Sequence, residues 1–175
     1  MTKILLHACC GPCATYPFEF LRGQDYEVTG FFYNPNIFPI DEYSKRKEAM
    51  GKFADQVGLS VIYQDNDVQI EPGPPAGEAG NCEECYKVRL RKCAKTAKEK
   101  GFDCFSTTLL ISPYQKHELL KETGEKIALE ENINFLYHDF RVGFQKSREL
   151  SRLMDLYRQK YCGCEKSKSQ NPNDK

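Results

Sequence analysis

The sequence lacks three features that would each indicate a compartment or a partner. No apolar run approaches the roughly 18–20 residues that a membrane-spanning helix requires, so we expect no membrane association. No charged segment followed by an apolar one opens the sequence, so we expect no secretory signal and predict a cytoplasmic protein. The 25 basic and 25 acidic residues cancel, which argues against a non-specific binder of polyanions but leaves room for a local basic face.

Cysteine is too scarce for a disulfide scaffold, yet too frequent to ignore. Nine cysteines among 175 residues fall below the roughly 8–10 % typical of small secreted disulfide proteins. A chain of this length can be stable on one hydrophobic core, without covalent bridges. In a reducing compartment, clustered thiols indicate metal ligands or redox groups. We predict one domain at residues 1–164 and a polar, disordered tail at residues 165–175.

Short apolar runs alternate with segments of helical length, and turn residues separate them. The expected strands cover residues 3–10, 26–33, 59–63, 103–110 and 134–138. The expected helices cover residues 13–21, 41–57, 82–100, 112–131 and 145–160, with Pro12 in the first turn of the first helix and Asp41 and Asn81 as caps of the next two. The proline- and glycine-rich residues 72–80 are expected to form a mobile loop. This alternation predicts an α/β fold: a single domain with a mostly parallel, five-stranded, Rossmann-like sheet and helices on both faces.

Unusual residues follow the carboxyl ends of the expected strands, where open parallel sheets bind ligands. They are Cys9 and Cys10, Asn34 and Asn36, Cys82 and Cys85, Thr107 to Tyr114, and Asp139 with Arg141. We therefore expect one shared cleft.

The cysteines form three groups, at residues 9, 10 and 13, at 82 and 85, and at 162 and 164. Cys82 and Cys85 lie one turn apart at the start of a helix, where the backbone dipole is expected to lower the pKa of a thiol. Cys162 and Cys164 directly precede the polar tail, which a shared metal would hold in place. Cys93 and Cys104 lie inside expected elements and are interpreted as small buried hydrophobes.

Three kinds of site remain open on the residues alone. Seven clustered thiols exceed the four ligands of a zinc ion, which favours iron–sulfur chemistry over a zinc-stabilised binding module. The tetrapeptide Cys10-Gly11-Pro12-Cys13 also matches the active site of a thioredoxin-like thiol–disulfide reductase. That reading leaves the other two cysteine groups unexplained.

Six motifs together resemble the epoxyqueuosine reductases of the QueH family. They run from Leu5 to Cys13, Phe32 to Ile37, Cys82 to Tyr86, Thr107 to Gln115, Asp139 to Arg141 and Tyr157 to Cys164. The resemblance implies reduction of epoxyqueuosine to queuosine in the anticodon loop of tRNA, the last step of queuosine biosynthesis. It also implies a [4Fe–4S] cluster and an additional mononuclear iron. The implied metal ligands are Cys9, Cys10, Cys82, Cys85, Cys162 and Cys164. Cys9, Cys10, Cys82 and Cys85 are the cofactor-binding candidates, and the division of the six between the cluster and the separate iron is left open.

Removing the oxygen of an epoxide needs two electrons and an acid for the departing oxygen. Asp139 and Tyr114 are the candidate acids, with His138 as a third possibility. The electron donor is not apparent from the sequence.

Loop RNA is bound by stacking of its bases and by cations at its phosphates. Four tyrosines near expected strand ends are candidates for stacking: Tyr33, Tyr43, Tyr86 and Tyr114. An expected basic rim comprises Arg46, Lys47, Arg89, Arg91, Arg141, Lys146, Arg148, Arg152 and Arg158. From these sets and the strand ends we select Tyr33, Asn34, Arg89, Arg141 and Arg148 as substrate-binding residues. Arg89 shares a helix face with Cys82 and Cys85 and is expected to point toward the metal.

Overall fold

The computed structural model describes residues 1–65 and 81–164 of the chain. Its elements are β1 (Thr2–His7), α1 (Gly11–Gly23), β2 (Tyr26–Phe32), α2 (Ile40–Val57), β3 (Val61–Tyr63), α3 (Cys82–Glu99), β4 (Cys104–Thr107), the 3-10 helix η1 (Thr108–Ile111), α4 (His117–Glu131), β5 (Asn134–Phe135), the 3-10 helix η2 (Phe140–Gly143) and α5 (Phe144–Leu153). The expected loop at residues 72–80 and the expected tail at residues 165–175 lie outside the described residues.

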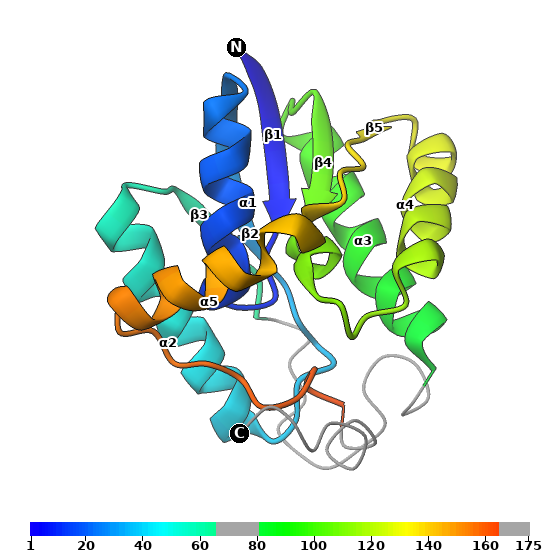
Figure 1. Cartoon of the computed structure of the whole chain (residues 1–175). Helices are drawn as coiled ribbons and strands as arrows, with labels where there is room; N and C mark the ends of the chain where they lie inside the picture. Colours follow the sequence, from blue (N-terminus) through cyan, green and yellow to red (C-terminus); the bar gives the residue numbers. More distant parts are fainter. Residues whose placement is uncertain (66–80, 165–175) are drawn as a thin grey trace.

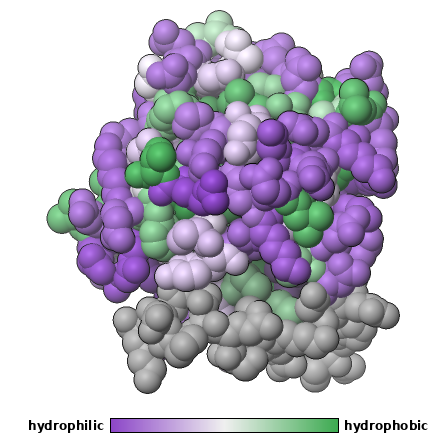
Figure 2. Space-filling model, turned by 45° about the vertical axis from the view of Figure 1, so that its right-hand side comes forward, coloured by the Kyte–Doolittle hydropathy of each residue, from purple (hydrophilic) through white to green (hydrophobic). Residues whose placement is uncertain are grey.

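The five strands form one parallel sheet in the order β3-β2-β1-β4-β5, which confirms the predicted α/β fold. β1 is the central strand, and Ile4, Leu5 and Leu6 are buried in it because helices cover both of its faces. α1 packs on α2 and α5, whereas α3 packs on α4 (Figure 1). The face drawn in Figure 2 is mostly hydrophilic, with hydrophobic residues only in small groups. No helix within the described ranges has the length and apolarity to cross a bilayer.

Several expected boundaries were wrong, at the starts of helices as well as at the ends of strands. α2 begins at Ile40 after Pro39, so Asp41 lies inside the helix and does not cap it. β4 ends at Thr107, whose hydroxyl accepts a bond from the Leu109 backbone N–H at 3.1 Å and starts η1.

The C-terminal half differs from the expectation in three further places. Residues 112–116 form a turn, so α4 begins only at His117. β5 is two residues long, which leaves His138 outside it. α5 ends at Leu153, and Asp155 adopts a left-handed conformation with φ of 52°. The chain then continues as an extended strap, residues 154–164, which crosses beneath the carboxyl ends of the strands (Figure 1). We call this segment the C-terminal strap.

The order of the strands reverses between β1 and β4, and this switch point places the site. β2 and β3 lie on one side of β1, and β4 and β5 on the other. Open sheets of this kind have a crevice at the switch point, outside the carboxyl ends of the strands. His7, the last residue of β1, holds this edge together: Nδ1 lies 3.0 Å from Thr107 Oγ1, and Nε2 lies 3.1 Å from the carbonyl oxygen of Tyr33. Burial and then Arg89 lower the pKa of His7 to about 4, so the imidazole is neutral at physiological pH.

Candidate metal centre

Three cysteines meet where β1 turns into α1. Cys9 follows the strand, Cys10 is the N-cap of α1, and Cys13 lies in the first helical turn. The helix can begin here because Pro12 suits its first turn and because Gly11 has no side chain. A Cβ on Gly11 would lie 2.4 Å from the carbonyl oxygen of Ala49, so only glycine lets α1 approach α2 so closely.

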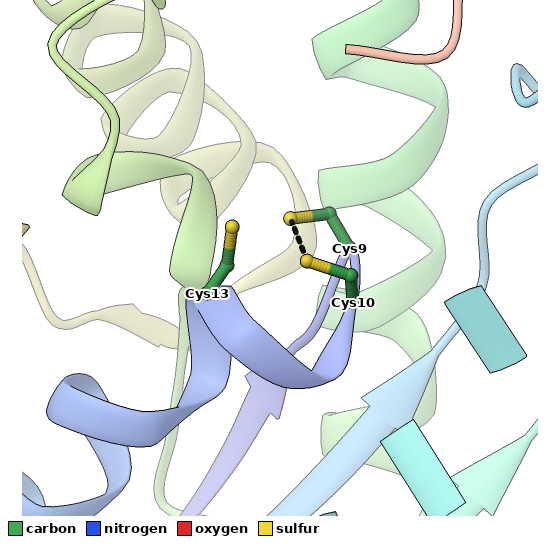
Figure 3. A group of neighbouring side chains, drawn as sticks. All are labelled: Cys9, Cys10 and Cys13. Carbon is green, nitrogen blue, oxygen red and sulfur yellow. Dashed lines mark hydrogen bonds between the residues drawn. The ribbon is translucent and has the colours of Figure 1, made fainter. Parts of the chain in front are cut away.

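The three sulfur atoms lie within 4.8 Å of one another, and we call them the cysteine triad. The sulfurs of Cys9 and Cys10 are 4.0 Å apart, and Cys13 approaches them from the first turn of α1 (Figure 3). Thr108, at the end of β4, accepts a bond from the Cys9 backbone N–H at 3.2 Å and donates its hydroxyl to Cys9 Sγ at 3.5 Å. The triad therefore lies at the switch point, between the carboxyl ends of β1 and β4.

The triad favours one thiolate at a time. Hydrogen bonds from Cys10 and Cys13 lower the pKa of Cys9, whereas the pKa values of Cys10 and Cys13 are raised. Burial is the main cause for Cys10, and the bonds that Cys13 donates to its two neighbours are the main cause for Cys13. Buried thiols this close cannot all ionise, because their negative charges would repel one another in a medium of low dielectric constant. A bound cation would remove that obstacle, so the donor set fits a thiophilic metal.

A second pair of thiols lies at the start of α3. Asn81 caps this helix as expected, and its side chain accepts the Glu84 backbone N–H at 3.2 Å. Arg89 is 3 % exposed and donates to Cys85, from Nη2 to Sγ at 3.1 Å and from Nε to the carbonyl oxygen at 3.2 Å. Arg89 therefore contacts Cys85 from the helix face that it was predicted to share with the two thiols, and its orientation toward a metal stays a prediction. The expected lowering of the pKa is wrong for Cys85, because burial raises it by more than Arg89 lowers it.

The C-terminal strap brings Cys162 toward the same region. Cys162 interacts electrostatically with Cys85 and with Arg89, and Arg89 also interacts with Cys9. The guanidinium of Arg89 therefore lies in the field of thiols from β1, α3 and the strap. Within residues 1–65 and 81–164, the triad is the one group of three potential ligands whose donor atoms all lie within 4.8 Å of one another.

A fully buried arginine holds the strap. Arg46 of α2 is 0 % exposed and donates to the carbonyl oxygens of Tyr161 at 2.7 Å and Cys162 at 2.9 Å. Its Nε pairs with Glu42 at 2.8 Å, and the other carboxylate oxygen of Glu42 accepts from Tyr157 at 2.6 Å. We call Arg46, Glu42 and Tyr157 the strap anchor. It fixes the backbone directly beside Cys162.

Gly163 also fixes the position of the C-terminal strap. Its backbone has φ of +115°, and an added Cβ would lie 3.0 Å from the Ile37 side chain. Its carbonyl oxygen accepts the Phe38 backbone N–H at 3.1 Å. A glycine between the two cysteines is thus required both by the backbone conformation and by the close contact with the loop after β2.

The sequence comparisons place the chain in a known family. Residues 4–170 match the family model described as epoxyqueuosine reductase QueH. The chain belongs to the QueH family. An epoxyqueuosine reductase QueH of Dehalococcoides mccartyi is 38 % identical over 164 residues, covering 93 % of this chain and 90 % of the relative. A protein of the same name from Thermotoga maritima is 34 % identical over 175 residues, covering 94 % and 89 %.

One solved structure shows the fold alone. A predicted subunit of a tRNA methyltransferase from Methanocaldococcus jannaschii superposes with a TM-score of 0.54 at 14 % identity, covering 87 % of this chain and 75 % of that one. At this identity the likeness carries no assignment of activity, but it agrees with the parallel sheet derived from the sequence pattern.

Two cysteines of this QueH chain are buried in the core, as predicted. Cys93 contacts the carbonyl oxygen of Leu5 at 3.8 Å, and Cys104 contacts that of Lys3 at 4.0 Å. Burial raises the pKa of both thiols, that of Cys104 to about 11. Neither belongs to the triad. They are small hydrophobes with weak donors.

The candidate acids lie in different surroundings. Asp139 accepts from Arg141 at 2.8 Å and 2.7 Å, and these bonds lower the pKa of the carboxyl to about 2. His138 stacks on Phe20 with the ring centroids 4.1 Å apart. Tyr114 is 51 % exposed, and its ring meets Phe144 edge-on at 6.1 Å. Tyr114 is thus the most accessible of the three.

The residues predicted to bind substrate divide into buried and exposed ones. Tyr33 and Asn34 are buried at the end of β2, where the Asn34 amide donates to the carbonyl oxygen of Ala8 at 2.9 Å. Tyr43 and Tyr86 are also buried, so they offer no ring face to an incoming base. Only Tyr114 of the four predicted tyrosines is largely open to solvent.

The predicted basic rim is wrong in part. Arg46 and Arg89 are buried, so they cannot belong to a surface rim. Four more cations pair with carboxylates: Lys47 with Asp65, Arg91 with Glu130, Arg141 with Asp139 and Lys146 with Glu19. The remaining three, Arg148, Arg152 and Arg158, line one pocket together with Cys13 of the triad.

Sequence reasoning missed three contributors to the site. Cys13 was left out of the implied ligand set although it closes the motif that contains Cys9 and Cys10. Thr108 was named only within the run from Thr107 to Tyr114 that was expected at the cleft, with no role of its own. Arg46 was taken for a surface cation, because a charged residue in an amphipathic helix ordinarily faces solvent.

Proposed function

We propose that this protein reduces epoxyqueuosine to queuosine in the anticodon loop of tRNA. Membership of the QueH family is the observation that carries the proposal. Its support from geometry is the cysteine triad, which lies where ligands of open parallel sheets bind. A reduced, cytoplasmic setting suits free thiols at all nine cysteine positions.

The metal group implied by the family is a [4Fe–4S] cluster with an additional iron. We propose Cys9, Cys10, Cys82, Cys85, Cys162 and Cys164 as its protein ligands and add Cys13 on the strength of the triad. Buried thiols that are mutually close but unable to ionise together fit such a group. When bound, the group supplies electrons one at a time and a Lewis acid for oxygen.

The reaction balances with two electrons and two protons. Both carbon–oxygen bonds of the epoxide break, a carbon–carbon double bond forms, and the oxygen leaves as water. An external reductant must supply the two electrons. The chain itself must bind the nucleotide, exclude bulk water and deliver protons.

Tyr114 and Asp139 are the proposed proton donors, and for Asp139 the role depends on Arg141. With its pKa near 2 the carboxyl is ionised at neutral pH and has no proton to give. If Arg141 turned to a phosphate of the RNA, the pKa of Asp139 would return toward its ordinary value of 3.8, at which the carboxyl is still ionised at neutral pH. Of the two proposed donors, Tyr114 is therefore the better placed. Arg141 and Arg148 are proposed to contact the substrate directly. Arg89, Tyr33 and Asn34 are buried, so we propose that they act in substrate binding by shaping the edge of the sheet beneath it.

The test is anaerobic purification followed by turnover. The protein should contain iron and acid-labile sulfide in near-equal amounts and, with a chemical one-electron reductant, convert epoxyqueuosine in tRNA to queuosine, as detected by mass spectrometry of the digested RNA. Cys82→Ala should lose iron and activity together, whereas the matched variant Cys104→Ala should keep both.

The two alternatives predict other results. A zinc-stabilised module would be colourless, would hold stoichiometric zinc and would leave epoxyqueuosine unchanged. A thioredoxin-like reductase would be free of metal and would reduce a model disulfide through Cys10 and Cys13. Either result would overturn the proposal.

A further inference from the structure

We propose that a pocket beside the triad holds the epoxide-bearing nucleotide of the RNA, with its base against an aromatic wall and its phosphates on a basic rim. This inference rests on the proposed function and assigns it a binding site. The pocket lies between the start of α1, the end of η1, α5 and the C-terminal strap, and we call it the α5 pocket. Its lining includes Cys13, Tyr114, Phe144, Arg148, Arg152, Arg158, Gln159 and Lys160.

The charge of the α5 pocket has one sign. Among the described residues that line it, four are basic (Arg148, Arg152, Arg158 and Lys160) and none is acidic. None of the four forms an ion pair within residues 1–65 and 81–164. Two other pockets mix both signs, with Lys98 beside Asp103 in one and Lys87 beside Glu83 in the other. In a chain without net charge, this concentration of cations favours an anionic ligand.

An aromatic wall adjoins these cations. Tyr114 is exposed and packs edge-on against Phe144, and the Arg148 guanidinium lies 5.8 Å from the centre of the Phe144 ring. Aromatic faces next to guanidinium groups are the surface on which unpaired RNA bases stack. A free phosphate has no ring that could stack on these aromatic side chains. The combination of cations and aromatic rings therefore favours a nucleotide.

The pocket opens onto the metal centre. Cys13 lines it, and Cys13 is also a member of the triad, so a ligand there lies next to the proposed reacting centre. Gln159 lines the same pocket, and its side-chain oxygen is buried without a hydrogen-bond partner among the described residues. An unsatisfied buried acceptor costs about 1–3 kcal/mol, a cost that a base N–H donor would remove.

The volume limits what can enter. The α5 pocket measures about 240 Å³. This lies below the roughly 300–1,000 Å³ of pockets that enclose a whole drug-sized ligand. One ring system can therefore enter, while the neighbouring nucleotides stay outside, where Arg152, Arg158 and Lys160 can contact their phosphates.

A tryptophan reporter tests the aromatic wall. The chain contains no tryptophan, so Tyr114→Trp introduces a single indole at the pocket. In the iron-loaded protein, an anticodon stem–loop RNA carrying epoxyqueuosine should quench its fluorescence by stacking. Leu129→Trp, an exposed position on α4, is the matched control and should show no quenching. Equal quenching in both variants, or none in Tyr114→Trp, would overturn the proposal, as would quenching by inorganic phosphate alone.

Charge variants test the rim. Arg148→Gln should weaken binding of the same RNA and reduce the slope of log affinity against log salt by about 0.7–1 per lost phosphate contact. Lys126→Gln removes one charge on α4 and should change neither quantity.

The two proposals fail in different ways. If the wild-type protein reduces epoxyqueuosine in tRNA but Arg148→Gln and Tyr114→Ala bind RNA like wild type, the pocket assignment is wrong and the function stands. If RNA quenches Tyr114→Trp and Arg148→Gln weakens binding although no reduction occurs, the pocket is a nucleotide site and the proposed reaction is wrong.

Discussion

At the scale of single residues, the structure adds Cys13 as a candidate metal ligand beside Cys9 and Cys10. Its sulfur belongs to a group of three that all lie within 4.8 Å, so no feature of the distances separates it from Cys9 and Cys10. It also lines the α5 pocket, whereas Cys9 and Cys10 do not. A residue with both properties is placed either to bind metal or to face the substrate beside it.

Replacement of Cys13 tests the first of these roles. If the three thiols hold a cation jointly, as proposed, Cys13→Ala should reduce bound iron as Cys9→Ala does, measured as iron and sulfide per chain after anaerobic purification. Cys93→Ala is the matched control, since it removes a buried thiol of the core that lies outside the triad, and it should keep full metal content. Full iron in Cys13→Ala would instead assign this thiol to the pocket.

The pair formed by Asp139 and Arg141 gives a prediction in pH. The bonds from Arg141 hold the folded-state pKa of Asp139 at about 2, below its ordinary value of 3.8. The pair therefore adds stability above pH 4 and loses it as the pH falls through about 2. In Arg141→Gln, the carboxyl pKa measured by NMR titration should rise toward 3.8. An unchanged titration curve would mean that Arg141 does not stabilise the carboxylate.

At the scale of elements, sequence patterns predicted the order of strands and helices but not where they end. The apolar run at the start of the chain correctly predicted a strand, although β1 ends at His7 and not at Cys10. The cap at Asn81 correctly predicted the start of α3, because this signal is local. The end of β4 was missed because the Thr107 side chain diverts the chain into η1. The C-terminal strap was expected to be helical to residue 160. Its extended course depends on Arg46 and Glu42, more than a hundred residues away in sequence, which no local pattern contains.

The distance in sequence between contacting residues also limited what could be predicted of the site. The strand-end rule correctly predicted that Cys9 and Cys10 would lie at the ligand-binding edge of the sheet. It could not distinguish exposed from buried cations, because that distinction depends on which helix faces the strap. Arg46 and Arg148 are both arginines in amphipathic helices, yet one is fully buried and the other lines a pocket.

The strap anchor makes a prediction at this scale. Arg46→Leu leaves Glu42 buried without its partner and frees two backbone carbonyl groups. The free energy of unfolding should therefore fall by close to the roughly 3–5 kcal/mol typical of a broken buried ion pair. Hydrogen exchange of residues 157–164 should accelerate and bound iron should fall. Lys52→Gln, which removes a largely exposed pair with Asp155, should change stability by no more than about 0.5 kcal/mol. An unaltered exchange rate in Arg46→Leu would show that the strap is held by other contacts.

At the scale of the whole molecule, the fold joins three distant parts of the chain at one edge of the sheet. The triad follows β1, Cys82 and Cys85 begin α3, and the strap carries Cys162 and Cys164. Electrostatic contacts of Arg89 already link thiols from all three parts. Metal binding there would cross-link the sheet, a helix on one face and the strap that is anchored to α2 on the other.

Removal of the metal should therefore lower the stability of the entire domain. A ligand that binds only the folded state stabilises it by about 4 kcal/mol at a thousand times its Kd, which for a chain of this size corresponds to a Tm shift on the order of 10 °C. Calorimetry of the loaded protein, before and after anaerobic chelation, should show that shift. Cys93→Ala should lower both Tm values equally, because its thiol contributes packing alone, whereas Cys85→Ala should reduce the difference between the loaded and chelated forms. Identical Tm values for the loaded and chelated wild-type protein would show that the metal does not join these elements.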